Sequence, residues 1–175
     1  MQVAGKFIVL GTFALGFLMA GGAWWYHYTE SRRAAEFWGA DAVALLVGSS
    51  DVTLLELGEP STEGVVGRAA KQKFDLTEKK GLVHLRHSLT YDADFAWDQR
   101  RREPLADGAD WTFAMRFNKG QRELVVLFTR DFARIGRVVD ADGAAEVDVL
   151  PCPRLGPVLV KYLGEIGVPV VDVER

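Results

Sequence analysis

An uncharged apolar stretch near the N-terminus is the feature that most constrains how this chain folds. Residues 7–26 contain no charged side chain, and the stretch ends in Trp24, Trp25 and Tyr26. A helix of this length rises about 30 Å, the thickness of a bilayer hydrocarbon core, and aromatic residues are enriched at the membrane interface. The sequence therefore predicts a transmembrane helix from Phe7 to Tyr26.

The same residues also resemble a cleaved secretory signal, with Lys6 as its charged start and 21–23 as a small-residue cleavage site. We favour an uncleaved signal-anchor, because the apolar stretch is longer than a signal sequence needs. Lys6 and the α-amino group precede the stretch, and Arg32 and Arg33 follow it, so the positive charges on the two sides nearly balance and decide little about orientation. The short N-terminal tail favours an inside N-terminus, and hence an exported domain held by a single pass at the inner cell membrane.

The chain divides into a membrane anchor at 1–29, a stalk at 30–40 and one globular domain at 41–175, which is long enough to bury a core. Charged residues make up 26% of the chain and the net charge is −3. This is an ordinary surface composition without the basic excess that nucleic-acid binding requires, so no nucleic-acid partner is predicted.

Alternation of apolar and polar residues gives the clearest strand prediction. Large apolar residues occupy every second position from 111 to 117, namely Trp111, Phe113, Met115 and Phe117. They should lie on one buried sheet face. The following segment, 123–129, is apolar on both faces, which predicts a central strand.

Weaker patterns complete the fold. In the first half they predict a hairpin of 42–47 with 52–57, a loop at 58–64, a strand at 65–71 and a helix near 78–91; a helix over 42–47 is the alternative to the hairpin. In the second half they predict an exposed loop at 100–110, a hairpin of 134–139 with 146–150 across the Asp140–Gly143 turn, and a helix over 155–166. The predicted fold class is α+β: a transmembrane helix followed by an antiparallel meander with two helices on one face.

Small residues recur at every fourth position within the apolar stretch. Thr12, Gly16 and Ala20 would form a stripe along one side of the helix, where a second helix could approach closely. This pattern predicts helix packing with another membrane protein in the lipid bilayer, although such residues are also common in membrane helices in general.

Two histidines are the basis of the predicted metal site. His84 and His87 are three residues apart on a predicted helix, and Asp92 and Asp94 follow. Imidazole and carboxylate groups bind divalent metals. Without the additional ligands of a known zinc motif, two surface histidines explain the spacing more simply.

The single cysteine, Cys152, precedes the last predicted helix, whose dipole would lower the pKa of a nearby thiol. A buried structural cysteine is favoured, because Pro157 places the start of the regular helix further along. No nucleophile elbow or phosphate-binding loop is present in the sequence. The sequence therefore predicts no enzymatic activity, no cofactor and no small-molecule substrate.

Three phrases carry a resemblance to a known group of proteins. They are Gly-Gly-Ala-Trp-Trp-Tyr-His-Tyr at 21–28, Ala-Ala-Glu-Phe-Trp-Gly at 34–39, and the segment from Gly81 to Thr90. The arrangement resembles small single-pass bacterial envelope proteins with no assigned activity. This resemblance implies a membrane-anchored domain and transfers no functional residue.

The sequence thus favours a non-enzymatic, membrane-anchored accessory protein that is a subunit of, or attached to, a larger membrane complex. The alternative is a small metal- or tetrapyrrole-binding membrane protein that uses His84 and His87.

Overall fold

The computed structural model describes residues 2–105, 111–141 and 144–169, with side chains from residue 11 onward except at 27, 62–63, 140–141 and 144. The predicted Asp140–Gly143 turn lies largely outside these residues. The helices are α1 (Gln2–Glu30), α2 (Arg32–Trp38), α3 (Ala40–Gly48), α4 (Leu82–Ser88) and α5 (Leu155–Glu165), with 3-10 turns η1 (Asp92–Asp94) and η2 (Trp97–Gln99). The strands are β1 (Asp51–Val65), β2 (Arg68–Asp75), β3 (Arg101–Pro104), β4 (Trp111–Lys119), β5 (Arg122–Thr129), β6 (Arg134–Ala141) and β7 (Ala144–Pro151).

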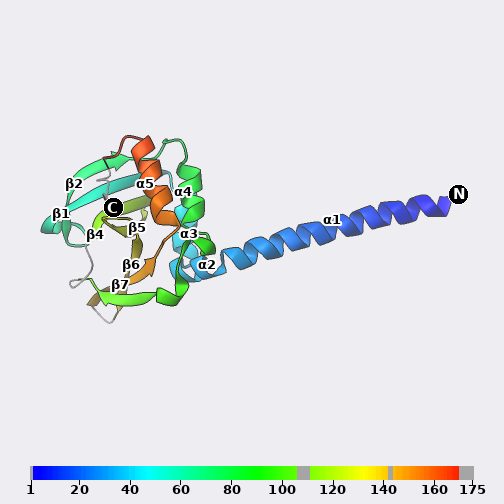
Figure 1. Ribbon diagram of the computed structural model, residues 1–175, viewed down its shortest axis with the longest axis horizontal. Coiled ribbons are helices and arrows are strands. Elements are labelled where there is room, and N and C mark those ends of the chain that lie inside the picture. Colours follow the sequence, from blue (N-terminus) through cyan, green and yellow to red (C-terminus); the bar gives the residue numbers. More distant parts are fainter. Residues whose placement is uncertain (1, 106–110, 142–143, 170–175) are drawn as a thin grey trace.

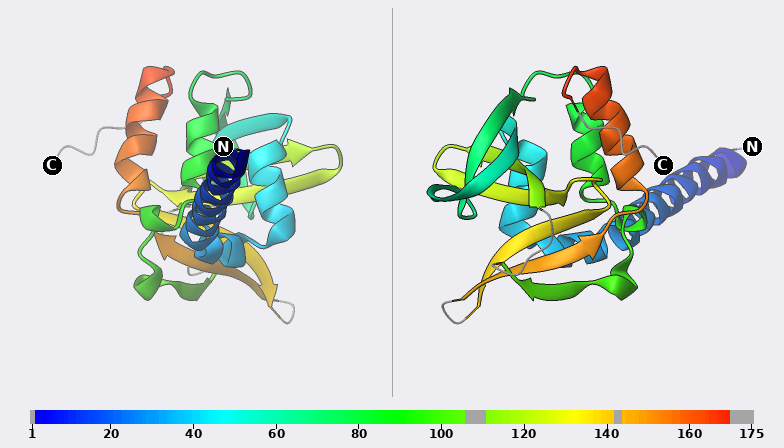
Figure 2. Two further views of the ribbon diagram at one scale, coloured as in Figure 1. Left: turned by 90° about the vertical axis from the view of Figure 1, so that its right-hand side faces the viewer. Right: turned by 60° about the vertical axis from the view of Figure 1, so that its left-hand side comes forward.

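Within the described ranges, seven strands form one antiparallel sheet in the order β2-β1-β4-β5-β6-β7-β3. Helices α3, α4 and α5 lie on the side of the molecule from which α1 projects (Figures 1 and 2). The α+β class, the central position of β5 and the hairpin of β6 with β7 are as predicted.

The main core lies between the helices and the sheet. Phe113, Met115 and Phe117 of β4 are buried there, against helical side chains such as Leu85 and Leu159. Trp111 belongs instead to a second cluster on the other sheet face, with Leu55, Leu127 and Val149 among its members. The pairing of β4 with β5 shifts register between Trp111 and Phe113, which breaks the simple alternation at this point.

Other elements differ from the sequence predictions. The 42–47 run is part of helix α3, the alternative interpretation, and it buries Leu45 and Leu46. Short apolar runs do not distinguish a strand from a buried helix by periodicity alone. Strand β1 continues through the predicted 58–64 loop, and part of the predicted 100–110 loop forms β3. Helices α2, α3, α4 and α5 all contribute buried side chains to the main core, whereas two helices were predicted on this face.

The segment predicted as a stalk, 30–40, contains helix α2. Its side chains Ala34, Phe37 and Trp38 are buried and belong to the main core. The aromatic pair Phe37 and Trp38 accounts for this placement, since burying such side chains removes a large apolar area from water.

The prediction of a transmembrane helix is corrected by the structure. Among the residues it describes, no helix has both the length and the sustained apolar character needed to cross a bilayer. From residue 11 onward, α1 contains Gly11, Gly16, Gly21 and Gly22, which contribute no apolar side chain and so lower the mean hydropathy of the helix. The single-pass signal-anchor, the inner-membrane location and the exported domain, which rested on that helix, are corrected with it.

Two glycines in α5 give a matched test of how this helix packs. A Cβ at Gly156 would lie 2.6 Å from the Phe132 carbonyl oxygen, whereas a Cβ at Gly164 meets nothing within 4 Å. We expect Gly156→Ala to destabilise the fold by about 1–3 kcal/mol through overpacking. Gly164→Ala should stabilise it by about 0.5–1 kcal/mol through helix propensity. Urea unfolding of both variants measures the two effects, and equal signs would contradict this packing of α5.

Candidate interaction site

Helix α1 projects from the domain (Figure 1). From residue 11 onward, its large apolar side chains are exposed. Phe17 is 77% and Leu18 is 74% exposed, and Trp24 stacks on Tyr28 with ring centroids 5.6 Å apart. The exposed set is Phe13, Leu15, Phe17, Leu18, Met19, Trp24, Trp25, Tyr26 and Tyr28. Large contiguous apolar surfaces are uncommon on monomeric proteins and mark contact sites.

The predicted small-residue stripe lies on this exposed helix. Thr12, Gly16 and Ala20 are all exposed, and a Cβ built at Gly16 has nothing within 4 Å. The three residues are spaced four apart, so they follow one side of α1. Because the side chains on that side are small, the backbone of another helix could approach it closely.

The beginning of α2 is fixed to the domain by a distant carboxylate. Asp92 of η1 accepts hydrogen bonds from the backbone N–H groups of Arg33, at 3.0 Å, and Ala34, at 2.7 Å. Ser31 occupies the N-cap position, but its side chain makes no capping hydrogen bond. Asp92 therefore satisfies N–H groups at the start of the helix, where a negative charge is also favourable.

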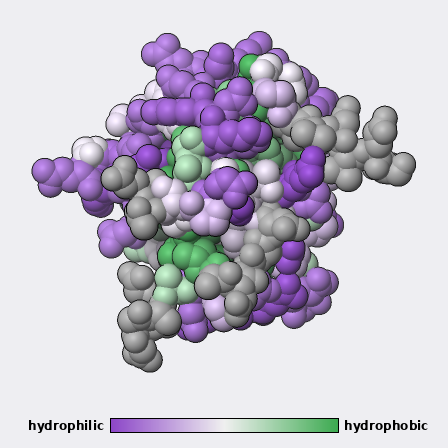
Figure 3. Space-filling model, turned by 90° about the vertical axis from the view of Figure 1, so that its left-hand side faces the viewer, coloured by the Kyte–Doolittle hydropathy of each residue, from purple (hydrophilic) through white to green (hydrophobic). Residues whose placement is uncertain are grey.

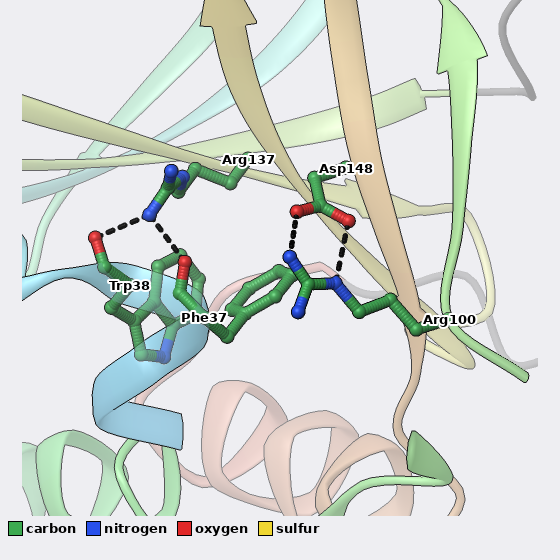
Figure 4. Close-up of polar contacts among 5 residues, drawn as sticks. All are labelled: Phe37, Trp38, Arg100, Arg137 and Asp148. Atoms are coloured by element: carbon green, nitrogen blue, oxygen red, sulfur yellow. Dashed lines mark hydrogen bonds and ion pairs between the residues drawn. The ribbon is translucent and has the colours of Figure 1, made fainter. Parts of the chain in front are cut away.

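The end of α2 is fixed by a guanidinium group. Arg137 of β6 donates hydrogen bonds to the carbonyl oxygens of Phe37 and Trp38 (Figure 4). The indole Nε1 of Trp38 donates to the Leu89 carbonyl at 2.7 Å. Burial lowers the pKa of the Arg137 guanidinium, the direction expected when a cation leaves water. We call α2 with Asp92 and Arg137 the α2 clamp.

An ion pair lies beside the α2 clamp and contacts Phe37 of α2. Asp148, only 1% exposed, accepts two hydrogen bonds from Arg100, at 2.9 Å from Nε and 2.5 Å from Nη2 (Figure 4). Bonding to Asp148 raises the pKa of the Arg100 guanidinium. The guanidinium also lies 5.2 Å from the centre of the Phe37 ring, within cation–π range. Two arginines therefore converge on the same aromatic residue of α2.

The four residues of the predicted metal site have separate surroundings. Asp92 belongs to the α2 clamp, and the His87 ring lies 5.7 Å from that of Tyr91. His84 lines a groove beside α5, and burial raises the pKa of Asp94. Where the structure describes side chains, no three His, Cys, Asp or Glu residues are grouped as a metal site requires. The metal hypothesis gains no geometric support.

Cys152 is fully buried, and its Sγ lies 3.1 Å from the Phe132 carbonyl oxygen. Burial, with a smaller contribution from Asp131 and Asp94, raises the pKa of the thiol to about 12. The thiol is therefore protonated at neutral pH, and a reactive thiolate has no support from this environment.

Grooves occur on both sides of the sheet. One, of about 460 Å³, lies between α4 and α5 and is lined by residues such as His84, Val158 and Tyr162. Another, of about 810 Å³, lies on the opposite sheet face, where Arg116 and Glu123 form an ion pair. On the side of the molecule turned away from α1, hydrophilic residues predominate around a smaller hydrophobic area (Figure 3).

Comparison of the chain with family models, with curated proteins and with solved structures finds no match. The resemblance to bacterial envelope proteins therefore gains no support from these comparisons.

The α2 clamp predicts that Asp92→Ala weakens the attachment of α1 to the domain. Loss of a capping carboxylate should cost about 1–2 kcal/mol of unfolding free energy. Limited proteolysis should then cut faster around residue 31, and urea unfolding should report the loss in stability. The control is Asp98→Ala, at an exposed aspartate of η2. Equal effects of the two substitutions would show that Asp92 contributes nothing particular.

The environment of Cys152 predicts slow alkylation by iodoacetamide in the folded protein at neutral pH and fast alkylation in denaturant. Its pKa rises from the ordinary value of 9.0 to about 12, so the folded state holds the thiol proton more tightly. The resulting stabilisation is complete below pH 9 and is lost as the pH rises toward 12. Rapid labelling of the native state would contradict the buried thiol.

Proposed function

We propose that this chain is a non-enzymatic accessory protein that binds an apolar helix of a partner protein through α1. The observation that carries this proposal is the exposure of the large apolar side chains on a helix that projects from its own domain (Figure 1). The partner would be a subunit of a larger assembly, to which α1 attaches the α+β domain.

The energetics favour a covered α1. Full burial of a side chain such as Phe17 or Leu18 is worth about 1.5–3 kcal/mol, and little of this free energy is gained within the chain, where both side chains are mostly exposed. The stripe of Thr12, Gly16 and Ala20 supports a helix as the binding element. Small residues permit the close interaxial approach that allows neighbouring large side chains to interdigitate.

The α2 clamp gives the attachment a defined position. Since α2 is fixed at both ends and follows α1 after a single residue, Ser31, the base of α1 is held at one place on the domain. A protein that only needed a tether would not require these buried contacts. The clamp therefore supports a role in which the domain is presented at a fixed position on the partner.

The non-enzymatic character of the proposal rests on the sequence, which contains no catalytic motif. No observation favours the alternative of metal or tetrapyrrole binding by His84 and His87. Both side chains are exposed, and His87 contacts Tyr91 instead of sharing a site with His84.

Gly16→Ile tests the proposed binding mode. Because nothing lies within 4 Å of a Cβ at Gly16, the substitution should leave the fold and the melting temperature unchanged. It should block close helix approach and reduce the amount of partner that co-purifies with tagged full-length protein from its native cells by about ten-fold, which corresponds to about 1.4 kcal/mol.

The matched control is Gly11→Ile. Gly11 is equally open, but it lies about 140° around the helix from Gly16 at about 100° per residue. This variant should retain the partner. Association that survives Gly16→Ile, or that fails equally with both substitutions, would reject the stripe as the binding surface.

A further inference from the structure

Exposed large apolar residues of the domain occur on the helices that lie on the α1 side. Outside α1, and among the residues with described side chains, they are Val47 of α3, Val83 of α4 and Val158 of α5, which are 59%, 69% and 58% exposed. Seen along α1, α3 lies on one side of it and α4 and α5 lie on the other (Figure 2). Exposed apolar side chains therefore occur both on α1 and on the helices beside its base, which we call the helical face of the domain.

The groove between α4 and α5 makes this face concave. Its volume of about 460 Å³ would hold one or two apolar side chains, and its walls include Leu85, Val158, Leu159 and Ile166. Leu85 and Leu159 belong to the main core, so the floor of the groove is held in place by the fold. An inserted side chain would meet a preformed apolar surface.

The polar groups at the groove rim favour an acidic residue next to the inserted side chain in the partner. Lys80 and His84 both line the groove and are exposed. Glu165, the acidic residue of the lining, already lies 3.9 Å from Lys161 of the same helix. The Lys80 ammonium group and the His84 ring remain available to a carboxylate, which would add electrostatic complementarity to the apolar contact.

We propose that the partner chain bound along α1 also contacts the α4–α5 groove, with an apolar side chain in the groove and an adjacent Asp or Glu beside Lys80 and His84. This inference rests on the proposed function, because it assigns a second contact to the same partner. The α2 clamp supports it, since the clamp fixes the point at which α1 leaves the domain. A partner helix alongside α1 approaches the domain on the helical face.

Site-specific photo-crosslinking in the full-length protein tests the inference. A photoreactive amino acid replaces Phe17 on α1, Val158 in the groove or, as a control, Ala70, an exposed residue at the groove on the other sheet face. We expect positions 17 and 158 to crosslink to one and the same protein in native cells, and position 70 to give no crosslink to it. The peptide joined to position 158 should contain an Asp or Glu next to an apolar residue.

Each alternative outcome overturns one part of the proposal. A crosslink from position 17 without one from 158, or one from 158 to a different protein or to a second copy of this chain, overturns the groove contact alone. The groove contact is also overturned if the peptide joined to position 158 lacks an acidic residue, or if position 70 crosslinks to the partner as strongly as position 158. Absence of any crosslink from position 17 removes the proposed function itself.

Substitution at the groove gives an independent measurement on the complex purified with the partner that position 17 identifies. Val158→Asp and Lys80→Glu place negative charge where the partner carboxylate should lie, and each should raise the dissociation rate about ten-fold. Ala70→Asp should leave the rate unchanged. Unchanged dissociation with both groove variants would overturn the second contact, whereas Gly16→Ile tests the contact along α1.

Discussion

The fixation of α2 is the interaction on which the rest of this structure depends. Asp92 closes its first turn and Arg137 binds its last carbonyl groups, while Phe37 and Trp38 fill the core between them. These contacts hold α2 in one position on the domain, and a single residue, Ser31, separates α2 from the long exposed helix α1.

The same contacts explain why charged residues are buried here at all. Asp148 is almost completely removed from water, which would be costly for an unpaired carboxylate. The bidentate contact from Arg100 offsets that cost, and the guanidinium lies against Phe37 in turn. Asp148 is buried but the Arg100 side chain is 39% exposed. Such an ion pair often adds little net stability compared with an apolar pair, but it requires a specific geometry. Its value here lies in positioning Phe37 and so α2.

Much of the sheet was predictable from the sequence, because alternation and turn residues are local signals. The buried face of β4 and the β6–β7 hairpin follow from residues close together in the chain. Trp111 was misplaced, since a register shift depends on how two strands pair and leaves no trace in the alternation. The α2 clamp could not be predicted either, because its contacts join residues far apart in the sequence: Asp92 lies 58 residues from Ala34, and Arg137 lies 99 residues from Trp38. An aspartate assigned to a metal and an arginine assigned no role thus proved to be the attachments of one helix.

Helices α1 and α2 differ in role because the side chains described on α1 are mostly exposed and those of α2 are partly buried in the core. In the part of α1 with described side chains, the large apolar groups are exposed, so changes there alter what the helix can bind and leave the core intact. Helix α2 buries three side chains in the core, so changes there alter folding and orientation together. Binding and stability are therefore encoded in adjacent helices separated by one residue. A partner that recognised α1 and the helical face at once would depend on both, because α1 supplies the contact area and α2 fixes the place where α1 joins the domain.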